Sequence, residues 1–480
     1  MKKWLSVFSM MALLGCNGTG AGKAVSSDIR IDGAGDNDNI DSAGVEMCAA
    51  DEGQVYVAWY DDRDGKNDIW LNYSLDGGRS WLEVPIKVNH SENGAAVDPV
   101  IGCDGNRVYV AWEDERDGEL ENHNIYFNYS ANAGQSWEAE DQLLDGDPDG
   151  RTMSLGAQIA TWNSRVYVAW FDSANGAYDI YLASSADEGE SFGEPVRVDS
   201  DSPGSAYSAY PQLGVAENGN VYVVWEDSRD ELSDIYFSYS GDFGASFSND
   251  FRLDGGDDAG SNDSFSPKLA VEGSNAYVIW HDDRNGDNRD IYMNWSSDSG
   301  GTWQGEALRV DGDVAGFSDS IYPSVVAYEG SALLTWQDAR NGAGYDIYHR
   351  SFLDGTFSSD EVRLDLGDGQ GYSNSLNPKT AVGENGLIVA WQDLRYDEVG
   401  EGYNDIFYNY SLDVGASFHS NDLRIDNVEA GSKFADELSV AVQRQRILAV
   451  WRDGRRGNSD IFFHGMKVGK EAEYKLVGKE

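Results

Sequence analysis

One phrase occurs eight times along this chain of 480 residues, and it constrains the fold more than any other feature. In each copy an apolar run ends in Trp, the pattern W-x-D-x-R or a close variant follows, and a stretch such as D-I-Y comes next. The copies are 53 to 60 residues apart, and a fixed period of about this size is typical of repeat architectures. The chain is therefore predicted to be one module repeated eight times. The repeated tryptophans are Trp59, Trp112, Trp170, Trp225, Trp280, Trp336, Trp391 and Trp451.

The first residues have the pattern of an export signal. Lys2 and Lys3 precede an apolar stretch, and the run Leu-Leu-Gly-Cys that ends at Cys16 resembles a bacterial lipobox, in which the Cys is lipidated and becomes the new N-terminus. An ordinary secretory signal is the alternative. We expect a lipid-anchored protein of the cell envelope that faces the periplasm or the exterior, at the outer membrane or cell surface. The expected divisions are a signal peptide at 1–15, a tether at 16–27, the repeat domain at 28–470 and a tail at 471–480.

The charge of the chain is strongly negative. The formal net charge of -49 becomes -51 after the signal peptide is removed, because residues 1–15 contain two Lys and no acidic residue. Nucleic acid and anionic lipid bind patches of Lys and Arg, so this surface would repel both of them. It would attract divalent cations instead. Solubility or adaptation to salt is the other explanation for the acidity.

Two cysteines remain once Cys16 is assigned to the lipid. Cys48 and Cys103 occupy corresponding segments of the first two repeats. In an oxidising compartment a disulfide between neighbouring repeats would form. Two buried free thiols are the alternative, and the sequence does not choose between them.

The repeat that begins at residue 267 shows the whole module. Its short apolar segments are 267–272, 276–280, 290–296 and 307–311, and Gly, Asn, Asp and Ser separate them, as expected for four strands, A to D. Strand B is a continuous apolar and aromatic run. A strand that is buried on both faces has such a run, whereas a sheet with one solvated face alternates. Small four-stranded sheets that stack around an axis bury both faces, which predicts an all-β, eight-bladed β-propeller of antiparallel blades.

The strand count predicts how the ring closes. Seven D segments follow their strands C, and the eighth copy, 29–32, precedes the first strand A instead. We therefore expect the N-terminal strand to complete the last blade, beside 447–451 and 460–464, and so to cover an open sheet edge. Residues 473–477 are the alternative source of this strand. The seven D segments are 85–89, 142–145, 196–199, 251–254, 308–311, 362–365 and 423–426.

A second motif follows strand C in six repeats. The first copy is SLDGGRSW, with Ser74, Asp76, Gly78 and Trp81. In the other five copies the residue that corresponds to Asp76 is Asn132, Asp187, Asp242, Asp298 or Asp413. The motif of repeat six is one residue short, and repeat eight lacks the motif. In such a turn Ser and Asp bond backbone amides, Gly adopts a positive φ and the aromatic residue packs into the blade. These motifs resemble the Asp-box of the sialidase-like, or BNR-repeat, propellers. The resemblance implies that the boxes lie on the face opposite an active site.

The resemblance also implies what a sialidase would need. Sialidases use three Arg on the substrate carboxylate, one of them from an Arg-Ile-Pro motif, with an Asp acid/base and a Tyr/Glu nucleophile pair. The nearest match is Arg30-Ile31-Asp32, but Arg-x-Asp recurs in most D segments, and known sialidases have six blades.

The W-x-D-x-R pairs are candidates for the ligand face, because they follow strand B. They would form a ring of ion pairs that ties the blades together, or a polar funnel for a glycan or a cation. In repeat three Ala174 replaces the Arg, so a ligand could enter there. The candidate residues are Asp61, Arg63, Asp114, Arg116, Asp172, Asp227, Arg229, Asp282, Arg284, Asp338, Arg340, Asp393, Arg395, Asp453 and Arg455.

One connection between strands D and A resembles half of a calcium loop. Asp145, Asp147 and Asp149 form D-x-D-x-D-G, in which carboxylates two residues apart face one hard cation. Gly156 stands where the bidentate Glu of a complete loop is expected. The sequence therefore indicates either a Ca²⁺ site or a solvated acidic loop.

Two functions remain after this inspection. The first is a monomeric cell-surface propeller that binds an extracellular glycan or protein, touches the membrane only through its lipid and binds no nucleic acid. The second is a glycan-active enzyme of the sialidase-like superfamily, a hydrolase or a polysaccharide lyase. Its acid/base carboxylates would lie in the irregular loops 119–123 or 397–403, because function concentrates where the repeats differ.

Overall fold

The computed structural model describes residues 28–33, 40–50, 52–117, 122–357, 360–384, 386–397, 400–426 and 428–467. The predicted signal peptide, Cys16, the tether, the tail and the alternative closing segment 473–477 lie outside these residues. Among the described residues no helix is long and apolar enough to cross a membrane.

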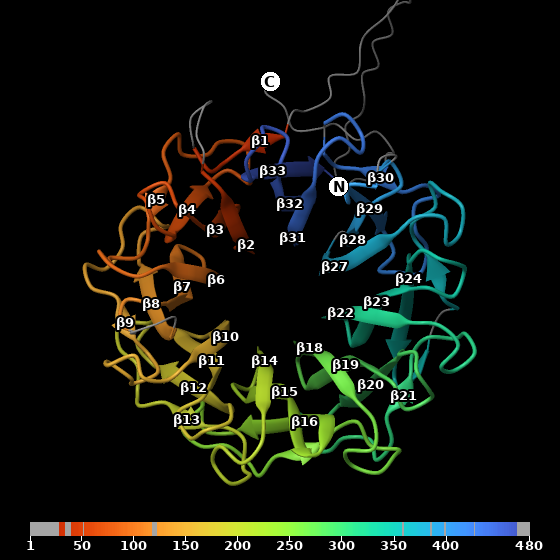
Figure 1. The fold of residues 1–480 in the computed structure, drawn as a ribbon, viewed down its shortest axis with the longest axis horizontal. Helices are drawn as coiled ribbons and strands as arrows, with labels where there is room; N and C mark the ends of the chain where they lie inside the picture. The colour runs from red at the N-terminus through yellow and green to blue at the C-terminus, as the bar shows by residue number, and fades with distance from the viewer. Residues whose placement is uncertain are drawn as a thin grey trace, which may run out of the picture.

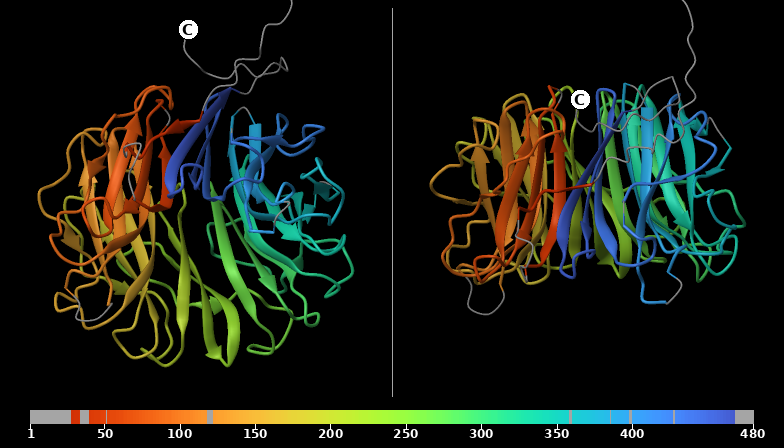
Figure 2. Two further views of the ribbon diagram at one scale, coloured as in Figure 1. Left: turned by 45° about the horizontal axis from the view of Figure 1, so that its top comes forward. Right: turned by 90° about the horizontal axis from the view of Figure 1, so that it is seen from above.

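The described residues form eight antiparallel sheets arranged in a ring, so the predicted fold class is confirmed (Figure 1). The first strand of each blade lies nearest the axis, and the later strands follow outward (Figure 1). Seen from the side, the blades stand upright around the axis and loops project from both faces of the ring (Figure 2).

The blades have the following strands. Blade 1 consists of β2 (Ser42–Ala49), β3 (Val55–Asp61), β4 (Asp68–Ser74) and β5 (Ile86–Lys87), and blade 2 of β6 (Ala96–Asp104), β7 (Arg107–Asp114), β8 (Asn124–Ser130) and β9 (Gln142–Leu143). Blade 3 consists of β10 (Ser154–Trp162), β11 (Arg165–Asp172), β12 (Asp179–Ser185) and β13 (Val196–Arg197), and blade 4 of β14 (Ser208–Val215), β15 (Val221–Asp230), β16 (Leu232–Ser240) and β17 (Phe251–Arg252). Blade 5 consists of β18 (Ser264–Glu272), β19 (Asn275–Asp282), β20 (Asp290–Ser296) and β21 (Leu308–Arg309), and blade 6 of β22 (Ser320–Tyr328), β23 (Ser331–Asp338), β24 (Asp346–Leu353), β25 (Thr356–Phe357) and β26 (Val362–Arg363). Blade 7 consists of β27 (Ser375–Gly383), β28 (Gly386–Asp393), β29 (Asp405–Ser411) and β30 (Leu423–Arg424), and blade 8 of β31 (Ala435–Gln443), β32 (Arg446–Asp453), β33 (Asp460–Lys467) and β1 (Ile29–Arg30).

The core lies between neighbouring blades, as the unbroken apolar strands predict. Tyr56 and Ala58 of β3 pack in one buried cluster with Val108 and Trp112 of β7, which belongs to the next blade. Both faces of each second strand are thus covered, one by the preceding blade and one by the following blade. This double burial is why the strand B sequences have no polar alternation.

The N-terminal strand closes the ring. Ile29 of β1 pairs with Phe463 of β33, and the Ile31 amide donates to the Ile461 carbonyl at 2.9 Å. Ile31 itself is buried in the cluster that joins blades 8 and 1. A disulfide between Cys48 on β2 and Cys103 on β6 links blades 1 and 2. Of the two alternatives for these cysteines, the disulfide is therefore the one that the structure has, and not two free thiols.

The S-x-D-x-G turns have the predicted internal bonding. In blade 1 the Ser74 hydroxyl donates to Asp76 at 2.8 Å and accepts from the Gly78 amide at 2.8 Å. Gly78 has a φ of +81°, and a Cβ there would lie 2.2 Å from Phe463 of blade 8. The turns therefore pack each blade onto the preceding one. Because they follow Ser74 at the far end of β4 from Asp61 and Asp68, we call their side the turn face and the other side the Trp-Asp face.

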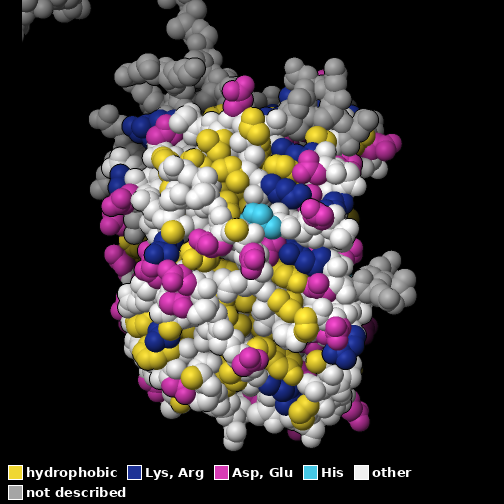
Figure 3. All heavy atoms as spheres, turned by 90° about the vertical axis from the view of Figure 1, so that its left-hand side faces the viewer, with side chains coloured by type: hydrophobic (Ala, Val, Ile, Leu, Met, Phe, Trp, Pro, Cys, Tyr) yellow, Lys and Arg dark blue, Asp and Glu magenta, His cyan; other side chains and the backbone are white. Residues whose placement is uncertain are grey.

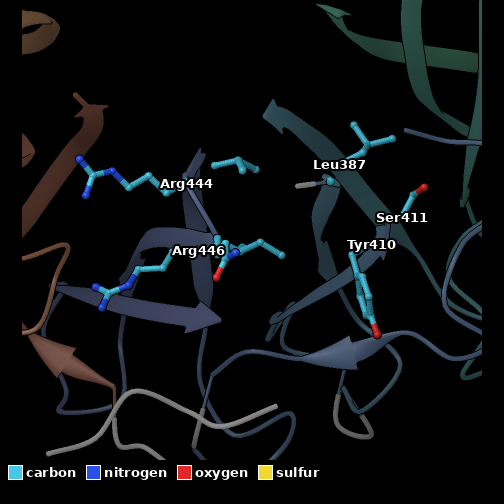
Figure 4. Close-up of a pocket in the computed structure, with 9 residues that line it drawn as sticks. Leu387, Tyr410, Ser411, Arg444 and Arg446 are labelled. Atoms are coloured by element: carbon cyan, nitrogen blue, oxygen red, sulfur yellow. The ribbon is translucent and has the colours of Figure 1, made fainter. Parts of the chain in front are cut away.

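Blade 8 lacks this turn, and a pocket of about 10 Å³ lies where it would pack (Figure 4). Tyr410 and Ser411 of blade 7 line it together with Arg446 of blade 8. The Gly134 turn of blade 2 covers Tyr73, the residue of blade 1 that corresponds to Tyr410. The pocket is about large enough for one water molecule.

Candidate functional site at the mouth of the central channel

The W-x-D-x-R residues lie beneath the Trp-Asp face and not in its central cavity. In blade 4 the buried Asp227 carboxylate accepts hydrogen bonds from Trp225 Nε1 at 2.8 Å and from Arg229 Nε at 2.8 Å. The Arg229 guanidinium lies 4.0 Å from the Tyr236 ring and also pairs with Asp250. Similar networks hold Asp61 with Arg63, Asp114 with Arg116, Asp282 with Arg284, Asp338 with Arg340, Asp393 with Arg395 and Asp453 with Arg455. Asp172 is the exception and is considered below.

The variable residue of the W-x-D motif lies beside the axis and differs from blade to blade. Every inner strand carries a β-bulge with one residue in the left-handed region, and bulges are common next to active sites. The variable side chain often holds the bulge of the next blade: the Gly156 amide donates to Glu113 at 2.7 Å, and the Ser266 amide donates to Glu226 at 2.7 Å. The variable residues are Tyr60, Glu113, Phe171, Glu226, His281, Gln337, Gln392 and Arg452, and the bulge residues are Gly44, Asp98, Gly156, Tyr210, Ser266, Tyr322, Asn377 and Glu437.

All of these bulge residues except Tyr210, together with Glu113 and Gln392 of the variable residues, line a cavity of about 760 Å³ at the mouth of the central channel. Such a volume suits a small molecule or a few sugar residues. The cavity breaks the eight-fold pattern, because its wall is acidic near blades 8, 1 and 2 and carries lysines in blades 5 and 7. The ionisable residues that line it are Glu46, Asp98, Glu113, Lys268, Lys379, Asp436 and Glu437.

Glu113 is a strongly perturbed carboxyl of this acidic wall. Burial, with a smaller contribution from the neighbouring Asp98, raises its pKa to about 7. The amide of Gly156 and His123 Nδ1, which lies 3.7 Å from Glu113 Oε2, are its nearest polar partners. Asp98 is an exposed residue that lines the cavity, and desolvation also raises its pKa. A protonated carboxyl and a second carboxyl therefore share one wall.

Basic groups face the cavity from the other side. Burial and the nearby Lys379 lower the pKa of Lys268 to about 8. On the acidic side the Arg452 guanidinium is already occupied, since it pairs with Asp436 at 2.7 Å and Glu437 at 3.0 Å. The Arg452 guanidinium is thus engaged by its own wall.

Aromatic side chains extend from this wall across blades 3 and 4. The Phe171 ring lies 5.0 Å from Tyr178 and 5.5 Å from Tyr210, and Tyr178 lies 5.3 Å from Tyr207. Tyr207 and Tyr210 are 40% and 51% exposed. Exposed aromatic rings beside a polar cavity offer flat apolar surfaces to a ligand. On the side of the ring that faces the viewer in Figure 3, acidic, basic and hydrophobic side chains are interspersed.

The predicted loops contribute in part. His123 ends the loop 119–123 and lies beside Glu113, while 118–121 are outside the described residues. In the loop 397–403 the Asp397 carboxylate accepts from the amides of Gly400 and Gly402, at 3.1 and 2.8 Å. This second loop therefore folds onto its own carboxylate.

The predicted calcium residues bond the backbone. Asp147 accepts from the amides of Arg151 and Thr152, Asp145 accepts from the Ile125 amide at 2.9 Å, and Asp149 pairs with Arg151. Calcium binding there stays a prediction. Two other acidic groups, Asp179 with Asp199 and Asp201 and Asp290 with Asp311 and Asp313, are close enough to hold a metal ion. Arg197 and Arg309 lie within hydrogen-bonding distance of these groups.

Sequence inspection missed Glu113, Asp98 and the aromatic rings. The signal was present, because the x of W-x-D is the one variable position inside an otherwise constant phrase. Only the fold shows that this variable side chain points toward the axis and contacts the next blade.

No protein-family model matches this chain, and no curated protein matches its sequence. Several solved structures resemble it. The polysaccharide lyase Uly1 is 12% identical over 82% of this chain and 94% of its own, with a TM-score of 0.48. An α-L-arabinanase from Penicillium chrysogenum is 14% identical over 65% and 93%, with a TM-score of 0.40. The NanB sialidase of Streptococcus pneumoniae is 11% identical over 74% and 65%, with a TM-score of 0.37. These similarities concern the fold alone, so the chemistry must come from the residues of this chain.

Proposed function

We propose that the chain binds a glycan at the mouth of the central channel and hydrolyses a glycosidic bond there. The observation that carries the proposal is Glu113, a buried carboxyl whose pKa is raised to about 7 and which lines a solvent-filled cavity where the repeat symmetry fails. A carboxyl that keeps its proton near neutral pH is what a glycosidase needs as a general acid.

Hydrolysis needs two carboxyl groups, and the acidic wall supplies them. Glu113 would protonate the leaving oxygen of the glycosidic bond. Asp98, in its ionised form, would take a proton from the attacking water or stabilise the developing positive charge on the sugar. The exposed rings of Tyr207 and Tyr210 would stack on sugar faces and hold the chain across the cavity.

The charges on this wall favour hydrolysis of an uncharged sugar. A lyase that removes a proton next to a uronate must neutralise the uronate carboxylate with nearby cations. Beside Glu113 and Asp98 the guanidinium of Arg452 is already paired with Asp436 and Glu437. We therefore expect the residue that is cleaved to be neutral.

The test is the release of reducing ends from a panel of neutral polysaccharides. Glu113→Gln should lower the rate by a factor of about 100 or more, because general acid catalysis contributes about 10²–10⁴-fold. Glu226→Gln is the matched control, since Glu226 occupies the corresponding position of blade 4, holds the next bulge in the same way and has a pKa raised to about 7 by burial.

The outcomes separate the two functions. Equal loss in both variants would show that the glutamates act through the bulges and not as the acid. Binding of a glycan without any product would contradict hydrolysis and leave a binding module, the first function predicted from the sequence.

We also propose that Cys16 carries the lipid that tethers this propeller to the cell envelope. Fatty-acid labelling of the wild type and its loss in Cys16→Ser is the expected result. Labelling that survives the substitution would contradict it. Sedimentation of the form that begins after Cys16 is expected to give a monomer.

A further inference from the structure

Seven blades share an Asp-Arg pair that blade 3 lacks. The residue two places after the Asp is Arg in those seven blades and Ala174 in blade 3. The contacts of the Arg in the other seven blades therefore define what the missing side chain would have touched.

In the seven blades the guanidinium occupies a constant place. Its carbon lies 3.9–4.3 Å from the centre of an aromatic ring on the third strand. In blade 4 the Asp227 carboxylate accepts five hydrogen bonds, three of them from Arg229 and the others from Trp225 and Ser208. The Arg229 side chain is 16% exposed, so this place reaches the surface of the Trp-Asp face.

In blade 3 the carboxylate of Asp172 and the Tyr181 ring are present at this place, but no cationic side chain of the described residues occupies it. Asp172 accepts from the Ser154 hydroxyl at 2.7 Å and the Ala174 amide at 2.6 Å, and from no arginine among the described residues. Burial raises the pKa of Asp172, and Trp170 Nε1, which is fully buried, lies near enough to oppose this rise. Trp170 Nε1 does not reach the hydrogen-bond geometry with which the other seven tryptophans donate to their Asp.

Without the guanidinium, the side chains that it would cover in blade 3 are more exposed than their counterparts in other blades. Asp172 is 4% exposed, while the corresponding Asp of each other blade is 0% exposed. Tyr181, which the guanidinium would cover, is half-buried, and its counterpart Tyr236 is buried. The nearest Arg of the blade, Arg197, is held by Asp179 and Asp199 and does not replace the missing group.

We propose that this place in blade 3, formed by Asp172, Trp170 and the Tyr181 ring, binds the guanidinium group of an arginine side chain from another polypeptide. A planar guanidinium can donate twice to one carboxylate and stack on a ring at the same time. An ammonium group lacks the planar fork for both contacts. A metal ion would need several free carboxylates, whereas Asp145 and Asp147, which lie near enough to interact with Asp172, accept from the Ile125 and Thr152 amides. The surrounding Tyr178 and Tyr207 give a partner apolar surface next to the charged contact.

The first experiment uses methylguanidinium chloride with the folded full-length protein. Calorimetry should show binding to the wild type, and the melting temperature should rise by about 1–3 °C at a concentration about tenfold above the dissociation constant. Ala174→Arg should melt higher than the wild type and lose both the heat of binding and the shift. Methylammonium chloride should bind at least tenfold more weakly.

Two further arms make the result decisive. Arg229→Ala opens the corresponding place in blade 4, so this variant should bind one more methylguanidinium than the wild type does. A peptide Gly-Arg-Gly should bind more tightly than methylguanidinium, and the same peptide with citrulline should not bind. Equal responses of the wild type and Ala174→Arg, or a lower melting temperature of Ala174→Arg, would overturn the site. Binding of methylguanidinium but not of the peptide would overturn the polypeptide as its source.

Discussion

Replacement of Glu113 by Gln should stabilise the protein in alkaline solution and leave it nearly unchanged in acid. Burial raises the pKa of this carboxyl from 4.5 to about 7, so the folded protein binds the proton more tightly than the unfolded chain does. The contribution of Glu113 to stability is therefore fully present below pH 4.5, falls as the pH rises, and stays low above about pH 7.

The size of the effect follows from the shift. About 2.5 pKa units correspond to about 3 kcal/mol, an upper value because the ionised protein can relax around the charge. Gln carries no charge at any pH and keeps the amide oxygen that accepts from Gly156. The free energy of unfolding of Glu113→Gln should thus exceed that of the wild type by up to about 3 kcal/mol at pH 8.5 and by less than about 1 kcal/mol at pH 4.5.

Urea unfolding followed by tryptophan fluorescence at the two pH values measures this difference. The same substitution at Glu226, whose pKa burial also raises to about 7, should behave alike and serves as the internal replicate. An identical change at pH 4.5 and pH 8.5 would falsify the assignment of a buried, protonated carboxyl. Gain of stability together with loss of hydrolysis, in Glu113→Gln alone, is the signature expected when a strained group is kept for function.

Three other outcomes are expected. Ile31→Ala should lower the free energy of unfolding by about 2–4 kcal/mol in urea, since Ile31 is buried between the first and last blades; an effect under about 1 kcal/mol would mean that the closing strand is dispensable. Replacement of Cys48 and Cys103 by Ala should cost about 2–4 kcal/mol relative to the disulfide-bonded wild type, and the reduced wild type should match the variant. EDTA should leave the melting temperature unchanged, because Arg197 and Arg309 already pair with carboxylates of the two close acidic groups and backbone amides already bond Asp147; a fall that calcium reverses would instead support a calcium site.

Much of the fold could be predicted from the sequence. A strand with no polar alternation, such as 276–280, must be covered on both faces, and repetition of such strands at a fixed period leaves few arrangements other than a ring of sheets. The copy of strand D at 29–32, which precedes the first strand A, indicated that the N-terminal strand completes the last blade, because an unpaired sheet edge must be covered. The disulfide was one of two alternatives, since sequence position does not show whether two Cys side chains point toward each other.

The functional cavity could not be predicted from the sequence in this way. Local sequence encodes burial, turn chemistry and strand order, because each depends on residues only a few positions apart. Glu113 became a candidate only when the next blade placed Gly156 against its carboxyl and the folding of its own blade placed Asp98 and His123 beside it. A raised pKa depends on how much water and which charges surround a group, and that environment is assembled from separate segments of two blades. The repeats thus specified the ring, whereas the packing of unlike side chains at its axis created the chemistry.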